Sequence, residues 1–139
     1  ELGKDNQDSL RKIIVVDVNT REGQLYAREL RKNLHIGGKL DGAYKLTSTI
    51  ITSSAETLSV QGAGSNLKKM SMTASFLLTD LNTGKVLFEN DVVGDATIGA
   101  VTSLYGQDKS ESHARDRLAI LLAQRVVRQL QFYFLEQYL

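Results

Sequence analysis

Residues 70–93 read MSMTASFLLTDLNTGKVLFENDVV, and this stretch decides the fold. In its first half, apolar and hydroxyl side chains alternate, which is typical of a strand with one buried face. Asn82-Thr83-Gly84 then predicts a short loop in which glycine takes a positive φ. The alternation resumes after the loop, so we expect a β-hairpin. Its apolar face consists of Met70, Met72, Ala74, Phe76, Leu78, Val86, Phe88 and Val92.

The chain before the hairpin predicts two more strands and a helix. Residues 12–18 read KIIVVDV, a short β-branched run that favours a buried strand. Asn19, with Glu22 three residues later, predicts a capping box at the start of a helix that ends at Gly37-Gly38. From Tyr44 a second alternating segment begins, with Leu46 and Ile50 on the apolar face. This segment predicts another half-buried strand.

The C-terminal part predicts a loop over residues 99–108 and then one long amphipathic helix. We expect this helix to run from about Lys109 to about Phe134, with Asp108 and Glu111 capping its start. The predicted apolar stripe comprises Leu118, Ala119, Ile120, Leu122, Val126, Val127, Leu130 and Tyr133.

These elements give the order β-α-β-β-β-α and an α+β fold in a single domain, residues 1–139, with residues 1–11 as a flexible lead-in. Both helices are expected on one face of a four-stranded sheet. The three consecutive strands predict an antiparallel meander, and the first strand joins through a helical crossover. The sheet is therefore expected to be mostly antiparallel but mixed.

Composition excludes several classes of protein. The 42% hydrophobic and 24% charged shares are ordinary for a globular domain, and the formal charge of +1 gives no bulk attraction to nucleic acid. The absence of cysteine excludes disulfides and thiol catalysis. No apolar run reaches the roughly 20 residues of a membrane-spanning helix. Because the sequence starts at Glu1, we expect a trimmed N-terminus, with any signal peptide or lipid-attachment site on the missing part.

The residues that could carry chemistry are scattered. His35 and His113 lack metal-ligand partners at helical spacing, and the carboxylates Glu89, Asp91 and Asp95 are interpreted as a solvated strand face. The sequence therefore predicts no catalytic residue, no metal and no cofactor.

Two surfaces stand out as candidate binding sites. On the outer face of the C-terminal helix, Arg117, Arg125 and Arg128 cluster with Ala114, Leu121 and Phe132, a composition typical of interface cores. The alternative is a plainly solvated face.

The second surface surrounds Gly62 and Gly64, the predicted tip of a hairpin. Lys68 and Lys69 follow this tip beside Leu67. Cations next to apolar side chains suit an anionic amphiphile, since lysine meets phosphate and the strand edge meets acyl chains. An ordinary mobile loop with charged gatekeepers remains the alternative.

The layout resembles the lipopolysaccharide-assembly lipoprotein family, LptE, of Gram-negative bacteria over roughly residues 12–131. The resemblance is carried by IIVVDV leading into REGQLYARELRKNL, by YKL, by SMTASFLLTDLNTGKVLFENDV and by SLYGQDKSESHARDRLAILLAQRVVRQL. It implies a periplasmic lipoprotein tethered to the outer membrane through a lipid anchor. It also implies that the domain plugs the lumen of the β-barrel translocon LptD and helps to assemble it. The acylated cysteine of the family is absent from this sequence.

The resemblance implies lipopolysaccharide binding through basic residues, and the nearest candidates by location are Lys68, Lys69 and Lys109. The predicted partner interface comprises Arg117, Leu121, Arg125, Arg128, Gly62 and Gly64. The alternative function is a periplasmic lipid- or small-ligand-binding auxiliary subunit of an envelope transporter, which requires a closed apolar cavity along the row Met70, Met72 and Phe76. A third possibility, an enzyme, lacks clustered catalytic residues.

Overall fold

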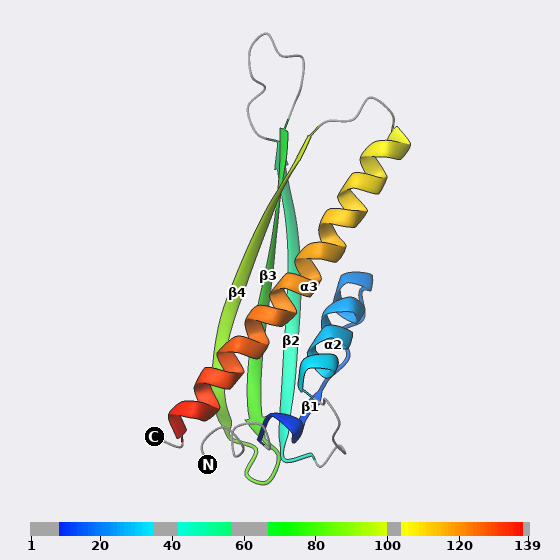
Figure 1. The fold of residues 1–139 in the computed structure, drawn as a ribbon. Coiled ribbons are helices and arrows are strands. Elements are labelled where there is room, and N and C mark those ends of the chain that lie inside the picture. The colour runs from blue at the N-terminus through cyan, green and yellow to red at the C-terminus, as the bar shows by residue number, and fades with distance from the viewer. Residues whose placement is uncertain (1–8, 35–41, 57–66, 100–103, 138–139) are drawn as a thin grey trace.

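The computed structural model describes residues 9–34, 42–56, 67–99 and 104–137 (Figure 1). The order β-α-β-β-β-α is confirmed. The helices and strands are β1 (Ile13–Val15), α2 (Arg21–Leu34), β2 (Tyr44–Glu56), β3 (Leu67–Asp80), β4 (Val86–Gly99) and α3 (Leu104–Gln137).

The sheet has the strand order β1-β2-β3-β4. The first strand pairs parallel with β2 over three residues, from Ile13 opposite Tyr44 to Val15 opposite Leu46. The other two pairings are antiparallel, so the predicted mixed sheet is confirmed. The β3–β4 connection contains Gly84 at a φ of 73°, the left-handed conformation that was expected of a glycine in this hairpin loop.

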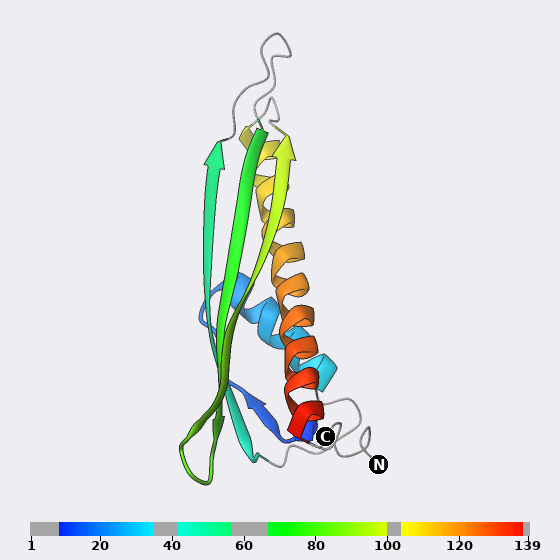
Figure 2. The same ribbon diagram turned by 90° about the vertical axis from the view of Figure 1, so that its left-hand side faces the viewer.

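Both helices cover the same face of the sheet, and the opposite face is open (Figure 2). The long helix α3 crosses the sheet obliquely, and α2 lies beside it near β1 and β2 (Figure 1). The alternation predicted for β3 is observed: its even-numbered side chains from Met70 to Leu78 are buried under the helices. Their odd-numbered neighbours face the open side, where hydroxyl groups predominate: Ser71, Thr73 and Ser75.

The start of α2 corrects the predicted cap. Thr20, not Asn19, caps the helix, because its Oγ1 accepts a hydrogen bond of 2.9 Å from the Gly23 N–H. Glu22 does not reach back to close a capping box. Instead its carboxylate forms an ion pair of 3.5 Å with Arg115 of α3.

The start of α3 was also predicted wrongly. The helix begins at Leu104, so Asp108 lies within it and the predicted loop is shorter at both ends, since β4 extends to Gly99. No proline interrupts this stretch, and an unbroken helix satisfies its backbone groups internally. Ala114 was also assigned to the wrong face, because it is fully buried.

The N-terminal segment joins the core earlier than expected. Ser9 and Leu10 are buried, with Leu10 only 5% exposed. The lead-in predicted for residues 1–11 therefore does not extend through Leu10; residues 1–8 lie outside the described part of the chain.

Candidate functional site

The described residues offer little metal-binding chemistry. No group of three or more His, Asp or Glu side chains within them could hold a metal ion. His113 is exposed on α3, and His35 lies outside the described residues. Asp91 is exposed on the open face of the sheet, and Asp95 accepts a hydrogen bond of 2.6 Å from Ser71. Candidate sites must therefore be sought among the binding surfaces.

The lysines near the start of β3 are engaged in ion pairs. Lys68 contacts Glu111 of α3, and both side chains are mostly buried, at 31% and 16% exposed. Lys69 points to the opposite face of the sheet and lies 3.9 Å from the Asp95 carboxylate, with about half of each side chain exposed. Lys68 therefore links the sheet to α3, whereas Lys69 is more accessible.

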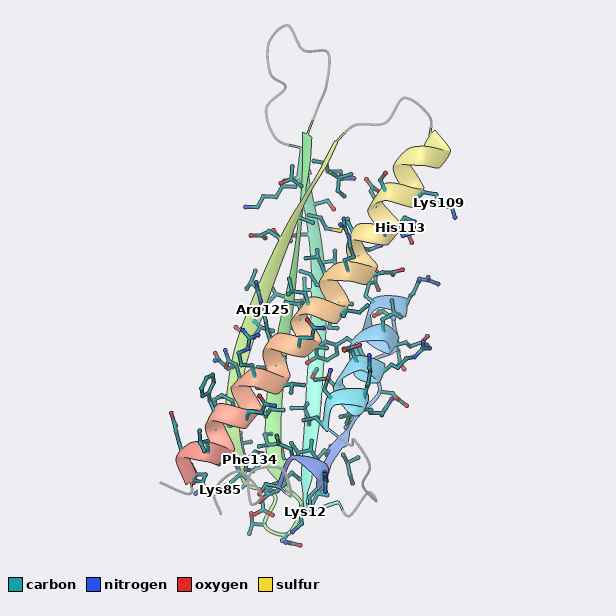
Figure 3. The ribbon with its side chains drawn as sticks, in the orientation of Figure 1. Lys12, Lys85, Lys109, His113, Arg125 and Phe134 are labelled. Carbon is teal, nitrogen blue, oxygen red and sulfur yellow. The ribbon has the colours of Figure 1, made fainter. Side chains whose placement is uncertain are left out.

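Lys109 is exposed near the start of α3, at the same end of the molecule (Figure 3). Gly62 and Gly64, predicted at the tip of the β2–β3 hairpin, lie outside the described residues. The structure thus brings the predicted lysines to one end of the domain, but Lys68 and Lys69 face opposite sides of the sheet.

The residues of the predicted α3 face differ in exposure and in contacts. Arg117 and Arg128 are exposed, and within the described residues neither forms an ion pair. Leu121 is half-buried against the core. Arg125 reaches across to β4, where Nη1 donates a hydrogen bond to the Val93 carbonyl oxygen (Figure 3).

A groove of about 690 Å³ lies between β4 and the C-terminal half of α3. Its walls include Phe88 and Tyr133, whose rings stack with centroids 5.1 Å apart, and Val93, which is 49% exposed. Burial raises the pKa of Tyr133. Phe132 also lines the groove and is 59% exposed. An exposed aromatic side chain near arginines is typical of an interaction surface.

Side chains cap the free edge of β4 beside this groove. Asn90 accepts a hydrogen bond of 2.9 Å from the Asp91 N–H through Oδ1, and its Nδ2 donates to Gln129 of α3 at 2.6 Å. The bonds to the Asp91 N–H and to the Val93 carbonyl occupy two backbone groups that an edge strand would otherwise present for pairing. Sequence reasoning missed this cap, because the Arg125–Val93 bond and the Asn90–Gln129 bond join residues 32 and 39 positions apart and follow no local pattern.

Within the described residues, no helix is both long enough and apolar enough to cross a membrane. The row Met70, Met72 and Phe76 is packed in the core with at most 3% of each side chain exposed. These side chains fill the layer between sheet and helices and do not line an open cavity.

Solved structures define the class of the fold. A candidate lipoprotein from Caulobacter crescentus aligns with a TM-score of 0.75 and 18% identity, covering 96% of this chain and 98% of that one. A minor lipoprotein from Acinetobacter baumannii gives 0.66 and 16%, covering 87% and 91%. Rare lipoprotein B from Shewanella oneidensis gives 0.65 and 16%, covering 92% and 98%. The fold is thus one found in bacterial lipoproteins.

The family follows from the sequence match. Residues 10–130 match the model of the family LptE: Lipopolysaccharide-assembly. This chain belongs to the LptE lipopolysaccharide-assembly family. No curated protein matches the chain. The expected family is thereby confirmed, and the expected role in assembly agrees with the name of the family.

Proposed function

We propose that this protein acts in lipopolysaccharide assembly at the outer membrane by plugging the lumen of the β-barrel translocon LptD and helping it to assemble. The family match over residues 10–130 carries this proposal. In the full-length protein a lipid anchor holds the domain on the periplasmic side of the outer membrane. The role is assembly and transport and not catalysis.

Much of the exterior of the domain is polar, although Ile51 and Val93 are exposed, and this polar surface supports a position inside a barrel. The interiors of transmembrane barrels are lined by polar side chains, so a plug must present polar surface on several sides. The open sheet face does so with hydroxyls on β3 and with carboxylates on β4, including Glu89 and Asp91. The outer face of α3 adds Arg117 and Arg128.

We assign the main barrel contact to the α3 face containing Arg117, Leu121, Arg125 and Arg128, and a further contact to the hairpin around Gly62 and Gly64. Arginine beside exposed aromatic surface is the composition of energetically dominant contacts. Arg128 is the most informative residue to change, because it is exposed and makes no ion pair within the described residues. Arg125 also caps the β4 edge, so its loss affects the domain itself.

Reversing the charge at Arg128 tests this assignment. Arg128→Glu in the full-length protein is expected to lower the barrel recovered by affinity purification from outer membranes several-fold. The matched control is Lys85→Glu, an exposed cation in the β3–β4 loop that does not line the groove beside α3. If Arg128→Glu and the control recover equal amounts of the barrel protein, the α3 face is not part of the interface.

Lipopolysaccharide contact is assigned to the lysine end of the domain, at Lys69 and Lys109, with Lys68 beside them. Lysine ammonium groups bind phosphate as point charges. Since Lys68 is held by Glu111 and is mostly buried, the more exposed Lys69 and Lys109 are better placed to meet a phosphorylated ligand.

The transporter-auxiliary alternative has less support. It requires a closed apolar cavity, whereas Met70, Met72 and Phe76 are packed under α3 as core residues. The proposed assembly role requires only exposed surfaces.

A further inference from the structure

The exposed stripe on the C-terminal half of α3 is complementary to itself. Arg128, Phe132 and Glu136 are spaced four residues apart and all line the groove beside β4. One helical turn, roughly 6 Å, therefore separates the aromatic ring from the cation on one side and from the anion on the other. The aromatic stands at the midpoint between opposite charges.

A two-fold axis through this stripe would place each charged side chain opposite one of the other sign, and the aromatic ring opposite its own copy. If two copies pack antiparallel with Phe132 at the axis, Arg128 of each copy faces Glu136 of the other, because an isologous interface repeats each contact twice. The two aromatic rings meet at the centre, where they are desolvated together. A parallel arrangement would instead place like charges opposite each other.

The groups that this packing requires are accessible. Phe132 is 59% exposed, and Arg128 and Glu136 are exposed. Neither charged side chain has an ion-pair partner in the described part of the chain. No ion pair of the domain has to break when the copies meet.

The capping contacts on β4 favour dimerisation through α3 over dimerisation by strand pairing at β4. At the same groove, the Val93 carbonyl is occupied by Arg125 and the Asp91 N–H by Asn90. A second copy adding a strand to β4 would have to displace both contacts. Packing of side chains on α3 displaces neither.

We propose that the free domain forms an antiparallel two-fold dimer through Arg128, Phe132 and Glu136 of α3. The stripe is narrow, so the buried area lies below the roughly 1,200 Å² of a stable interface, and the dimer is weak and exchanges rapidly. The dimer itself does not depend on the barrel proposal. One consequence does rest on that proposal: because Arg128 is assigned to both surfaces, self-association and barrel binding exclude each other.

Charge reversal with mixing gives a sharp test by sedimentation equilibrium of the 139-residue chain at low ionic strength. The wild-type average mass should rise with concentration above the monomer value of 15.4 kDa. Arg128→Glu and Glu136→Arg should each remain monomeric, because each places like charges opposite each other at both ends. An equimolar mixture of the two variants should form a heterodimer, since both cross-contacts become opposite in charge.

Control variants distinguish the effect of the Arg128–Phe132–Glu136 stripe from a general effect of changing the charge of the chain. Arg117→Glu lies outside the groove and Glu89→Arg lies on the open sheet face, so both should dimerise like the wild type. Phe132→Ser should weaken the dimer several-fold without affecting the fold, as followed by circular dichroism. Wild-type chain that stays monomeric at all concentrations, or a mixture of variants that stays monomeric, would overturn the proposal.

Discussion

Lys68 of β3 and Glu111 of α3 form an ion pair between residues 43 positions apart in the chain. The pair ties the start of the third strand to the beginning of the long helix. It also changes the interpretation of Lys68, which the sequence presents as a free cation at a binding loop. In the folded domain this lysine has a structural partner.

Breaking this ion pair is expected to destabilise the domain. Lys68→Glu places two carboxylates together at a mostly buried position, so we expect a loss of about 1–3 kcal/mol in the free energy of unfolding, between the values for surface and buried pairs. Urea denaturation measures it. The swapped double variant Lys68→Glu/Glu111→Lys should recover most of the loss, and no recovery would show that the pair itself contributes little.

Lipopolysaccharide binding should depend on Lys69 and Lys109. Loss of a charge-assisted contact costs about 1.5–3 kcal/mol, so Lys69→Glu/Lys109→Glu should weaken lipopolysaccharide binding at least about tenfold at low salt. Binding to immobilised lipopolysaccharide measures the change. A double variant that binds as well as Lys85→Glu, which reverses an exposed cation in the β3–β4 loop, would refute this placement.

A large side chain at Gly94, where α3 crosses β4, should destabilise the domain. A β-carbon there would stand 3.2 Å from Leu118 Cδ2 and 3.4 Å from Leu122 Cδ2. Gly94→Ala requires only small shifts of these flexible ends and should change stability by less than about 1 kcal/mol, whereas Gly94→Leu should cost about 1–3 kcal/mol. Gly99→Leu is the matched control, because a β-carbon at Gly99 on the same strand would have no atom of the described residues within 4 Å. Thermal unfolding measures the stability of the three variants, and Gly94→Leu should be the least stable of them.

The ionisation of Tyr26 should lower the free energy of unfolding in alkaline solution. Burial raises its pKa to about 12, and the 2.8 Å hydrogen bond to Ser48 opposes that shift only in part. Because the raised pKa favours the neutral phenol in the folded state, this stabilisation is complete below the unfolded pKa of about 10 and is lost as pH rises through about 12. Tyr26→Phe should lack this loss, so the difference between the two unfolding free energies should shrink between these pH values. A constant difference would contradict the burial effect.

The local elements were predictable because their patterns are local. The alternation from Met70 to Leu78 and the glycine of the hairpin loop specify β3, the turn and β4 without long-range information. Element ends were less predictable. Asn19 and Thr20 are both good capping residues, and only the observed hydrogen bond to the Gly23 N–H selects Thr20.

The candidate sites depend on contacts between distant segments, which periodicity does not encode. A helical wheel places Arg117, Arg125 and Arg128 near one another, but it does not show that Arg125 reaches the Val93 carbonyl. It also placed Ala114 on the outer face, although α3 buries it completely. The groove beside β4 arises only when the strand and the helix pack together.

The proposed role of this domain in lipopolysaccharide assembly requires a β-barrel partner in the outer membrane. Affinity purification of the full-length protein from outer membranes, followed by identification of its stoichiometric partners, tests it most directly. If the proposal holds, one large β-barrel protein is recovered in an amount equal to that of the domain. Recovery of inner-membrane transporter subunits without a barrel would contradict it and favour the transporter-auxiliary alternative.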